Sequence, residues 1–268
     1  MTGIRPGIES SIDIVARDGR ELQLVVLSPE EAEDAWKVQI RGSDHLLITR
    51  QDFFADSNGH SSQIWLRSRG TPKFDFDITP PLAVSPRATL PLIQTGSNSH
   101  MIHYAAEARE RKPELQYRQV QVADDAPPVK IGPAPSWRLV GVAQAPPEPD
   151  LPQAARWSFT FPQVAMDGLS DLFLQVRYRG DVARLYRSRE LLTDNFYNGE
   201  NWTIGLSRFL DRGSSSVLDL SILPLRKDAP IYLETFHNLE FPSNGQIDKL
   251  DDVRLVPEYQ LVIDGVNR

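Results

Sequence analysis

Short runs in which apolar and polar residues alternate recur along most of the chain. Residues 74–78 read Phe-Asp-Phe-Asp-Ile, and residues 157–161 and 172–178 alternate in the same way. Because successive side chains of a β-strand point to opposite faces of its sheet, this period of two predicts half-buried strands. Apolar runs and turn residues together predict strands over residues 11–16, 21–27, 36–40, 45–48, 64–66, 74–78, 157–161, 172–178, 182–186, 191–192, 202–206, 217–223, 230–233 and 253–256.

Turn residues stand between these runs, and helical patterns are scarce. Asp18 and Gly19 separate two apolar runs, and both residue types tolerate the positive φ that a type I′ hairpin turn requires. One short helix is predicted over residues 28–35, with Ser28 as N-cap and Pro29 at the first helical position. Repeated short strands with turns between them predict an all-β chain of sandwich or jelly-roll modules.

The alternation weakens between residues 82 and 153, where Pro is concentrated. Eight of the residues from 127 to 152 are Pro, which favours extended, polyproline-like backbone. A flexible linker is one interpretation, but the apolar residues Ile131, Trp137, Leu139 and Val140 favour an ordered connector, part of which lies on a neighbouring surface of the chain. The sequence therefore predicts two β-sandwich or jelly-roll modules joined by a partly ordered Pro-rich connector, with the parts spanning residues 1–82, 83–153 and 154–268.

Composition narrows the classes of partner. At 268 residues the chain is long enough for two β domains, and 40% apolar with 24% charged residues is typical of soluble globular proteins. The formal net charge is −7 and the basic residues are scattered, so no stripe for nucleic-acid phosphates is predicted. No apolar run of about 18 residues is present, so we expect no membrane partner. A neutral ligand such as a sugar fits this composition better.

The sequence contains few of the residues and motifs that bind a metal or a cofactor. Cys is absent, which excludes disulfides, thiolate metal sites and a Cys nucleophile. No phosphate-cradling Gly loop with Lys and no Gly-x-Ser-x-Gly elbow occurs, so no cofactor is expected. His100 and His103 could share a helix face as metal ligands, but a third ligand is not evident and no metal site is predicted. No secretory signal is recognised at the N-terminus, so the sequence as written is that of a cytoplasmic chain, and the localisation itself stays open.

Residues 171–232 carry a more specific signal. They contain Gly-Asp-Val-Ala-Arg-Leu-Tyr (180–186), Leu-Leu-Thr-Asp-Asn-Phe-Tyr-Asn-Gly (191–199), Trp-x-Ile-Gly-Leu-x-Arg-Phe (202–209) and Leu-Pro-Leu-x-x-Asp-Ala-Pro-Ile-Tyr (223–232). This segment resembles the C-terminal, galactose-binding-like β-sandwich of bacterial family 35 glycoside hydrolases, the β-galactosidase type. The N-terminal part is similar to the β module that precedes it there, whereas residues 90–150 match poorly.

The resemblance implies an accessory portion of such an enzyme. In that family the chemistry is carried by two Glu residues on a separate (β/α)8 barrel, which needs about 250 residues of alternating strand and helix. The family's acid/base Glu follows Asn, and no Asn-Glu dipeptide occurs in this chain. The resemblance therefore implies no catalytic residue here, a catalytic barrel domain or partner chain, and a galactoside-type carbohydrate as ligand.

The loop over residues 194–202 collects the groups from which a sugar site is built. Sugars stack on aromatic rings while carboxylate and amide groups bind their hydroxyls. The candidate carbohydrate-binding residues are Asp194, Asn195, Tyr197, Asn198 and Trp202. The structural alternative is that Phe196 and Trp202 belong to the core, while Asp194 and Asn198 shape the turn.

Three functions stay open at this point. The first is a non-catalytic accessory β-sandwich with a scaffold or weak carbohydrate-binding role. The second is a β-galactoside glycosidase with its own pair of carboxyls about 5 Å apart, which 36 acidic residues do not single out by spacing. The third is a structural or interaction protein that binds no sugar.

Overall fold

The computed structural model describes residues 10–40, 43–55, 63–82, 86–97, 100–147, 152–163, 165–211, 213–231 and 239–264. Within these ranges the chain is all-β apart from one short helix, which confirms the predicted fold class. Contacts divide the chain into two compact units, residues 1–111 with 258–268 and residues 112–257. The division into modules at residues 82 and 153 stays a prediction. No helix among the described residues is long and apolar enough to cross a membrane.

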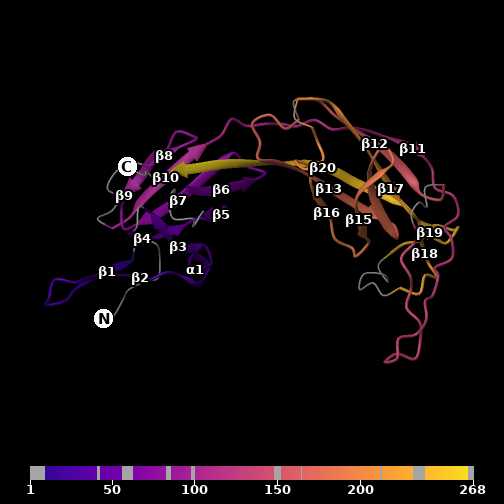
Figure 1. Ribbon diagram of the computed structural model, residues 1–268, viewed down its shortest axis with the longest axis horizontal. Helices are drawn as coiled ribbons and strands as arrows, with labels where there is room; N and C mark the ends of the chain where they lie inside the picture. Colours follow the sequence, from indigo (N-terminus) through magenta and orange to yellow (C-terminus); the bar gives the residue numbers. More distant parts are fainter. Residues whose placement is uncertain are drawn as a thin grey trace. The chain divides into compact units, whose positions relative to one another are not determined.

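The first unit contains two larger antiparallel sheets and a two-stranded hairpin (Figure 1). One sheet has five strands, in the order β3 (Ala35–Ile40), β4 (Ser43–Ile48), β7 (Lys73–Thr79), β10 (Ile102–Glu107) and β9 (Ile93–Ser97). The other contains β5 (Asp52–Ala55), β6 (Gln63–Arg69) and the end of β20 (Lys249–Asp264), which also pairs with β8 (Arg87–Ala88).

The core of this unit follows from the alternation along its strands. In β7, Phe74, Phe76 and Ile78 are at most 2% exposed, whereas Asp75 and Asp77 point to the opposite face. In β6, Ile64 and Leu66 are buried in the same alternating pattern. The period of two in the sequence therefore decided which face of each strand is buried.

The predicted helix is present as α1 (Pro29–Glu33). The Ser28 hydroxyl accepts a hydrogen bond from the backbone N–H of Glu31 at 3.2 Å, and the Glu31 carboxylate accepts one from the backbone N–H of Ser28 at 2.9 Å. This reciprocal pair is a capping box, which satisfies two amides that helix geometry leaves without partners.

The predicted Asp-Gly hairpin is confirmed as β1 (Ser11–Val15) and β2 (Glu21–Val25). A type I′ turn needs a positive φ at both of its central residues. Gly19 has a φ of 83°, but the φ of Asp18 is not positive, so the turn is of another type. The Asp18 side chain instead accepts a hydrogen bond from the backbone N–H of Arg20 at 3.2 Å, as in an Asx turn.

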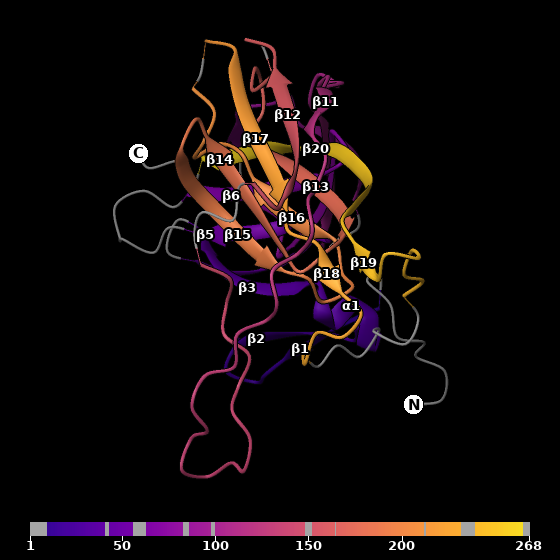
Figure 2. The same ribbon diagram turned by 90° about the vertical axis from the view of Figure 1, so that its right-hand side faces the viewer.

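The second unit is also a sandwich of antiparallel sheets (Figure 2). Its five-stranded sheet has the order β11 (Gln116–Gln121), β12 (Ala155–Phe161), β17 (Ser216–Ile222), β14 (Val182–Arg187) and β15 (Glu190–Phe196). The opposing sheet contains β16 (Trp202–Gly205), β13 (Asp171–Arg179) and the beginning of β20, and a short ribbon is formed by β18 (Leu225–Arg226) and β19 (Gln246–Ile247).

Tight packing surrounds the end of β13 in this unit. A Cβ added to Gly180 would meet Cγ2 of Ile222 and lie 2.9 Å from the carbonyl oxygen of Leu223, closer than real Cβ contacts allow. The guanidinium of Arg179 forms a bidentate pair with Asp251 on β20, at 2.8 and 2.7 Å. The absence of a side chain at Gly180 allows this close packing, and the Arg179–Asp251 pair joins β13 to β20.

The region of weak alternation contains structure that the pattern did not predict. Strands β9, β10 and β11 all lie in it. The expectation that its apolar residues lie on a neighbouring surface was wrong, because Ile131, Trp137 and Leu139 are 52, 76 and 103% exposed. The strand predicted over residues 230–233 falls partly on residues 232 and 233, which lie outside the described ranges.

Candidate functional site

The loop predicted as a carbohydrate site is divided between two strands and the turn that joins them. Asp194 and Asn195 belong to β15, Tyr197 and Asn198 to the turn, and Trp202 begins β16. Strand β15 is the edge of one sheet, and β16 belongs to the opposing sheet. The five residues therefore do not share one strand or one sheet.

Asn195 is used to join the two sheets of the second unit. The hydroxyl of Tyr178, on β13, donates to the backbone oxygen of Asn195 at 2.7 Å and accepts from its side-chain Nδ2 at 3.0 Å. Tyr178 is 1% exposed, and burial raises the pKa of its hydroxyl above the ordinary value. The hydroxyl therefore stays protonated and remains a donor at neutral pH.

Asn198 and Trp202 also have structural positions. The side-chain oxygen of Asn198 accepts from the backbone N–H of Glu200 at 3.0 Å, and Gly199 has a φ of 91°, so these residues shape the turn. Trp202 is 8% exposed and lies opposite Val176 in the β13–β16 pair. Its ring is therefore not available as an open stacking platform.

Tyr197 lines an open pocket of about 350 Å³ together with Phe196. The pocket is also lined by Asp181 and Gln144, and its remaining wall is apolar (Val129, Ala143, Ala145, Pro146 and Ile231). Phe196 is 50% exposed, which differs from the core position considered for it in the structural alternative. The backbone N–H of Tyr197 donates to the backbone oxygen of Asp181 at 2.9 Å, which fixes the turn beside the pocket.

Sequence reasoning did not select Phe196, Asp181 or Gln144 for this site. Phe196 stands two residues after Asp194 on an edge strand, so the two side chains share a face, and both are exposed. That spacing was the available signal for Phe196. Asp181 and Gln144 are 37 residues apart, and only the fold brings them to one pocket.

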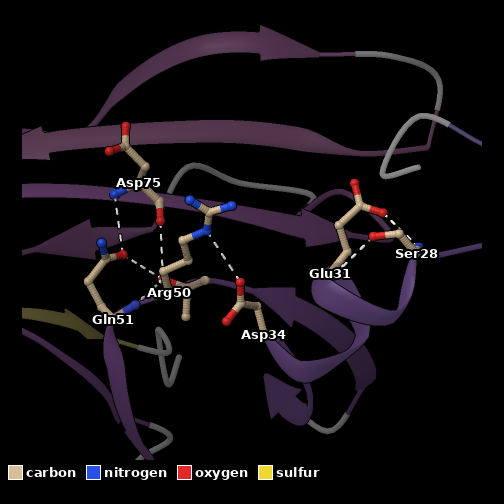
Figure 3. Close-up of polar contacts among 7 residues, drawn as sticks. Ser28, Glu31, Asp34, Arg50, Gln51 and Asp75 are labelled. Atoms are coloured by element: carbon tan, nitrogen blue, oxygen red, sulfur yellow. Dashed lines mark hydrogen bonds and ion pairs between the residues drawn. The ribbon is translucent and has the colours of Figure 1, made fainter. Parts of the chain in front are cut away.

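A second pocket, of about 660 Å³, lies on the first unit where α1 and the end of β4 meet strands β7, β9 and β10. Its polar wall includes four carboxylates, those of Glu31, Asp34, Asp75 and Asp77. Figure 3 shows three of them beside Arg50 and Gln51, which follow β4.

Side chains around this pocket hold one another in place. Arg50 pairs with Asp34 at 3.4 Å, as Figure 3 shows. The side-chain oxygen of Gln51 accepts from the hydroxyl of Thr49 at 2.5 Å and from the backbone N–H of Asp75 at 3.4 Å. These contacts connect the segment after β4 to strand β7.

Asp77 and His103 both line the same pocket and form a pair. They lie directly opposite each other on β7 and β10, and the Nδ1 atom of His103 contacts Oδ1 of Asp77. Burial raises the pKa of Asp77 above its ordinary value, and His103 lowers it in part. A Cβ on Gly96, in the neighbouring strand β9, would lie 3.0 Å from the His103 ring, so this glycine leaves space for the imidazole.

The two histidines considered as metal ligands do not act together. His103 lies on a strand, and His100 pairs through its Nε2 atom with Asp13 at 3.2 Å. Among the residues that the structure describes, no group of three or more His, Cys, Asp or Glu side chains is placed to hold a metal ion.

Comparison with known proteins identifies no family for this chain. No protein-family model matches the sequence, and no curated protein matches it. The resemblance to family 35 glycoside hydrolases therefore has no family-level support. Among solved structures, the rhamnosidase from Novosphingobium sp. PP1Y is similar at 13% identity and a TM-score of 0.26, over 92% of this chain and 27% of that one. This chain thus spans about a quarter of the rhamnosidase.

Proposed function

We propose that the chain is a non-catalytic accessory β-sandwich portion of a larger glycoside hydrolase of β-galactosidase type, with a weak carbohydrate-binding site in its second unit. The observation that carries the binding role is the pocket lined by Phe196, Tyr197, Asp181 and Gln144. It combines an exposed aromatic ring with a carboxylate and a carboxamide, which are the groups that sugar recognition needs. The catalytic partner in this proposal is a (β/α)8 barrel domain or chain.

In this site Phe196 is the stacking surface. Its ring is 50% exposed on the edge strand β15, and the sugar's apolar C–H face packs against it. The side chains of Asp181 and Gln144 bind the hydroxyls on the other side of the pocket. Because the pocket is small and open, we expect a Kd of about 1 mM for a monosaccharide.

An NMR titration with methyl β-galactoside tests this role. Binding should shift the backbone amides of residues 194–202, and Phe196→Ala should weaken binding at least about tenfold because the stacking surface is lost. Phe54→Ala is the matched control, because Phe54 is an equally exposed Phe (49%) on strand β5 of the first unit. Unchanged affinity in Phe196→Ala, with the fold intact, would contradict the proposed site. If neither this sugar nor other β-linked sugars bind, the result would favour a structural or interaction protein that binds no sugar.

The pocket on the first unit favours a second candidate, a glycosidase with its own carboxylates. Glycoside hydrolysis uses two acidic residues, one of which has a raised pKa so that it can donate a proton. Asp77 has a pKa raised by burial, and Asp75 stands two residues away on the same face of β7 in the same pocket.

The two candidates differ in turnover of an aryl β-galactoside by the purified chain. The accessory role predicts a rate no higher than the buffer blank. Turnover that is abolished by Asp77→Asn or Asp75→Asn, and retained in Asp52→Asn, would establish the enzyme instead. Asp52 is a suitable control because it is an exposed acid on β5 that does not line the pocket.

A further inference from the structure

An arm of residues 130–144 extends away from the sheets of the second unit. It is the pink loop at the lower edge of Figure 2. Its two sides are joined by hydrogen bonds from Gly132 N–H to Val142 O and from Gln144 N–H to Lys130 O, both at 2.8 Å. The isolated bridge between Ile131 and Ala143 belongs to the same pairing. The arm is therefore an ordered, hairpin-like segment.

Apolar side chains cover the arm. Five of them are more than two-fifths exposed, namely Ile131 (52%), Trp137 (76%), Leu139 (103%), Val140 (72%) and Val142 (41%). Single exposed apolar residues are common on proteins, but several within one short segment that includes a Trp are typical of an interaction surface. Arg138 lies over the ring of Trp137, with its guanidinium carbon 5.5 Å from the ring centroid.

Buried side chains fasten both ends of the arm. Before it, Gln246 donates to the backbone oxygen of Asp124 at 3.0 Å and accepts from the backbone N–H of Ala126 at 2.9 Å. After it, Arg184 is 6% exposed and donates to the backbone oxygen of Pro146 at 2.7 Å. Because its base is fixed, the arm loses little conformational freedom when it binds, which favours association.

The charge of the arm is opposite to that of the chain. Lys130 and Arg138 are its only ionisable residues, whereas the whole chain carries a formal net charge of −7. A surface with apolar groups and acidic residues would therefore complement the arm in both respects.

Such a surface exists on the same unit, along the edge strand β11. Among the strands that the structure describes, β11 pairs only with β12. Tyr117 is 49%, Val120 44% and Val122 74% exposed, and the exposed acids Asp124 and Asp125 follow directly. An edge strand with exposed apolar residues is a template for association with another chain.

We propose that the arm binds a second copy of this chain. The arm of each copy docks on the β11 edge of the other. Lys130 and Arg138 then face Asp124 and Asp125 across two equal contacts, as twofold symmetry requires. A stable interface buries roughly 800 Å² per partner, and the arm together with the β11 edge is the surface that each copy contributes to it.

Sedimentation equilibrium of the full chain between about 1 and 200 μM tests this proposal. The wild type should approach twice the 30.2 kDa of one chain at the upper concentrations. Trp137→Ala should weaken dimerisation roughly 30-fold, because buried Trp residues dominate interface energies and each dimer contains the contact twice. Trp36→Ala is the matched control, because Trp36 is 44% exposed on the first unit and should leave the dimer unchanged.

A charge exchange distinguishes this interface from any other. Lys130→Glu/Arg138→Glu and Asp124→Lys/Asp125→Lys should each be monomeric, because like charges then meet in both contacts. Mixing the two variants should restore a dimer, since each contact again joins opposite charges.

Three results would overturn the proposal. The first is a wild type that stays monomeric over the whole concentration range. The second is a dimer that Trp137→Ala does not weaken. The third is a monomer whose arm binds vesicles of anionic phospholipid, with binding lost in Trp137→Ala, because the arm would then face a lipid surface.

Discussion

Replacing Tyr178 with Phe removes the hydroxyl that joins the two sheets of the second unit. The hydroxyl makes two hydrogen bonds to Asn195, at 2.7 and 3.0 Å, and its residue is 1% exposed. Phe fills the same space, so packing is retained while a carbonyl oxygen and an amide nitrogen lose their partner. We expect a loss of about 2 kcal/mol in the free energy of unfolding, within the range for buried polar groups left unsatisfied.

Urea unfolding at pH 7, followed by Trp fluorescence, measures this loss. Trp157 and Trp202 are both 8% exposed and both belong to the second unit, so their emission reports on its unfolding. In thermal unfolding the same loss corresponds to about 4–8 °C in Tm. Tyr117→Phe is the control, because Tyr117 is 49% exposed and loss of its hydroxyl should change stability by less than about 0.5 kcal/mol.

A double-mutant cycle separates this contact from other effects. Asn195→Ala removes the side-chain amide, and combined with Tyr178→Phe it should be less destabilising than the sum of the single changes by at least about 0.5 kcal/mol. A loss below about 0.5 kcal/mol in Tyr178→Phe, or strict additivity with Asn195→Ala, would refute the reasoning. Asn195 would then be free to act as a ligand residue.

Further changes test other contacts in the same way. Gly180→Ala should lower the free energy of unfolding by about 1–3 kcal/mol in urea melts, because its added methyl has no space; wild-type stability would contradict that packing. The Arg179–Asp251 pair should stabilise the fold at neutral pH and lose its effect as pH falls. Burial raises the pKa of Asp251, but the hydrogen bonds and charges of Arg179 and Lys249 together outweigh burial and leave the pKa lowered. Arg179→Met should therefore make the free energy of unfolding fall less steeply below about pH 4. An unchanged pH dependence would show that the Arg179–Asp251 pair does not stabilise the fold. His103→Gln should raise the pKa of Asp77 in carboxyl NMR titrations, because a lowering influence is removed; a fall would show that another group controls it.

The structure also explains where sequence reasoning about the strands failed. Strands β9, β10 and β11 were not predicted, because their residues do not alternate cleanly between apolar and polar. In β11 five of the six residues are exposed, so the strand depends on its backbone pairing with β12 rather than on a buried face. The alternation of apolar and polar residues does not predict such a strand, because backbone hydrogen bonds form whatever the side chains are.

The candidate carbohydrate site was predicted as one continuous stretch of sequence, but its residues lie on two strands of different sheets and on the turn between them. Of the five residues predicted in the nine-residue stretch, Tyr197 lines a pocket, and a carbohydrate site there stays a prediction. Asn195 and Trp202 from the same stretch are used in the interior of the sandwich, whereas Phe196, expected as core, is half exposed. Aromatic residues close together in a turn do not reveal which of them will be buried, because strands of two different sheets leave the turn on either side.

The sequence by itself determined the fold class, the capping of α1 and the buried faces of strands such as β7 and β13. These features follow from local rules, since alternation at a period of two and a side chain that caps a helix act within a few residues. Tertiary structure alone decided that Asp181 and Gln144 meet beside Phe196, and that an apolar arm is left outside the core. These outcomes depend on which distant strands pair, and pairing depends on the burial achieved by the whole sandwich rather than on any single segment.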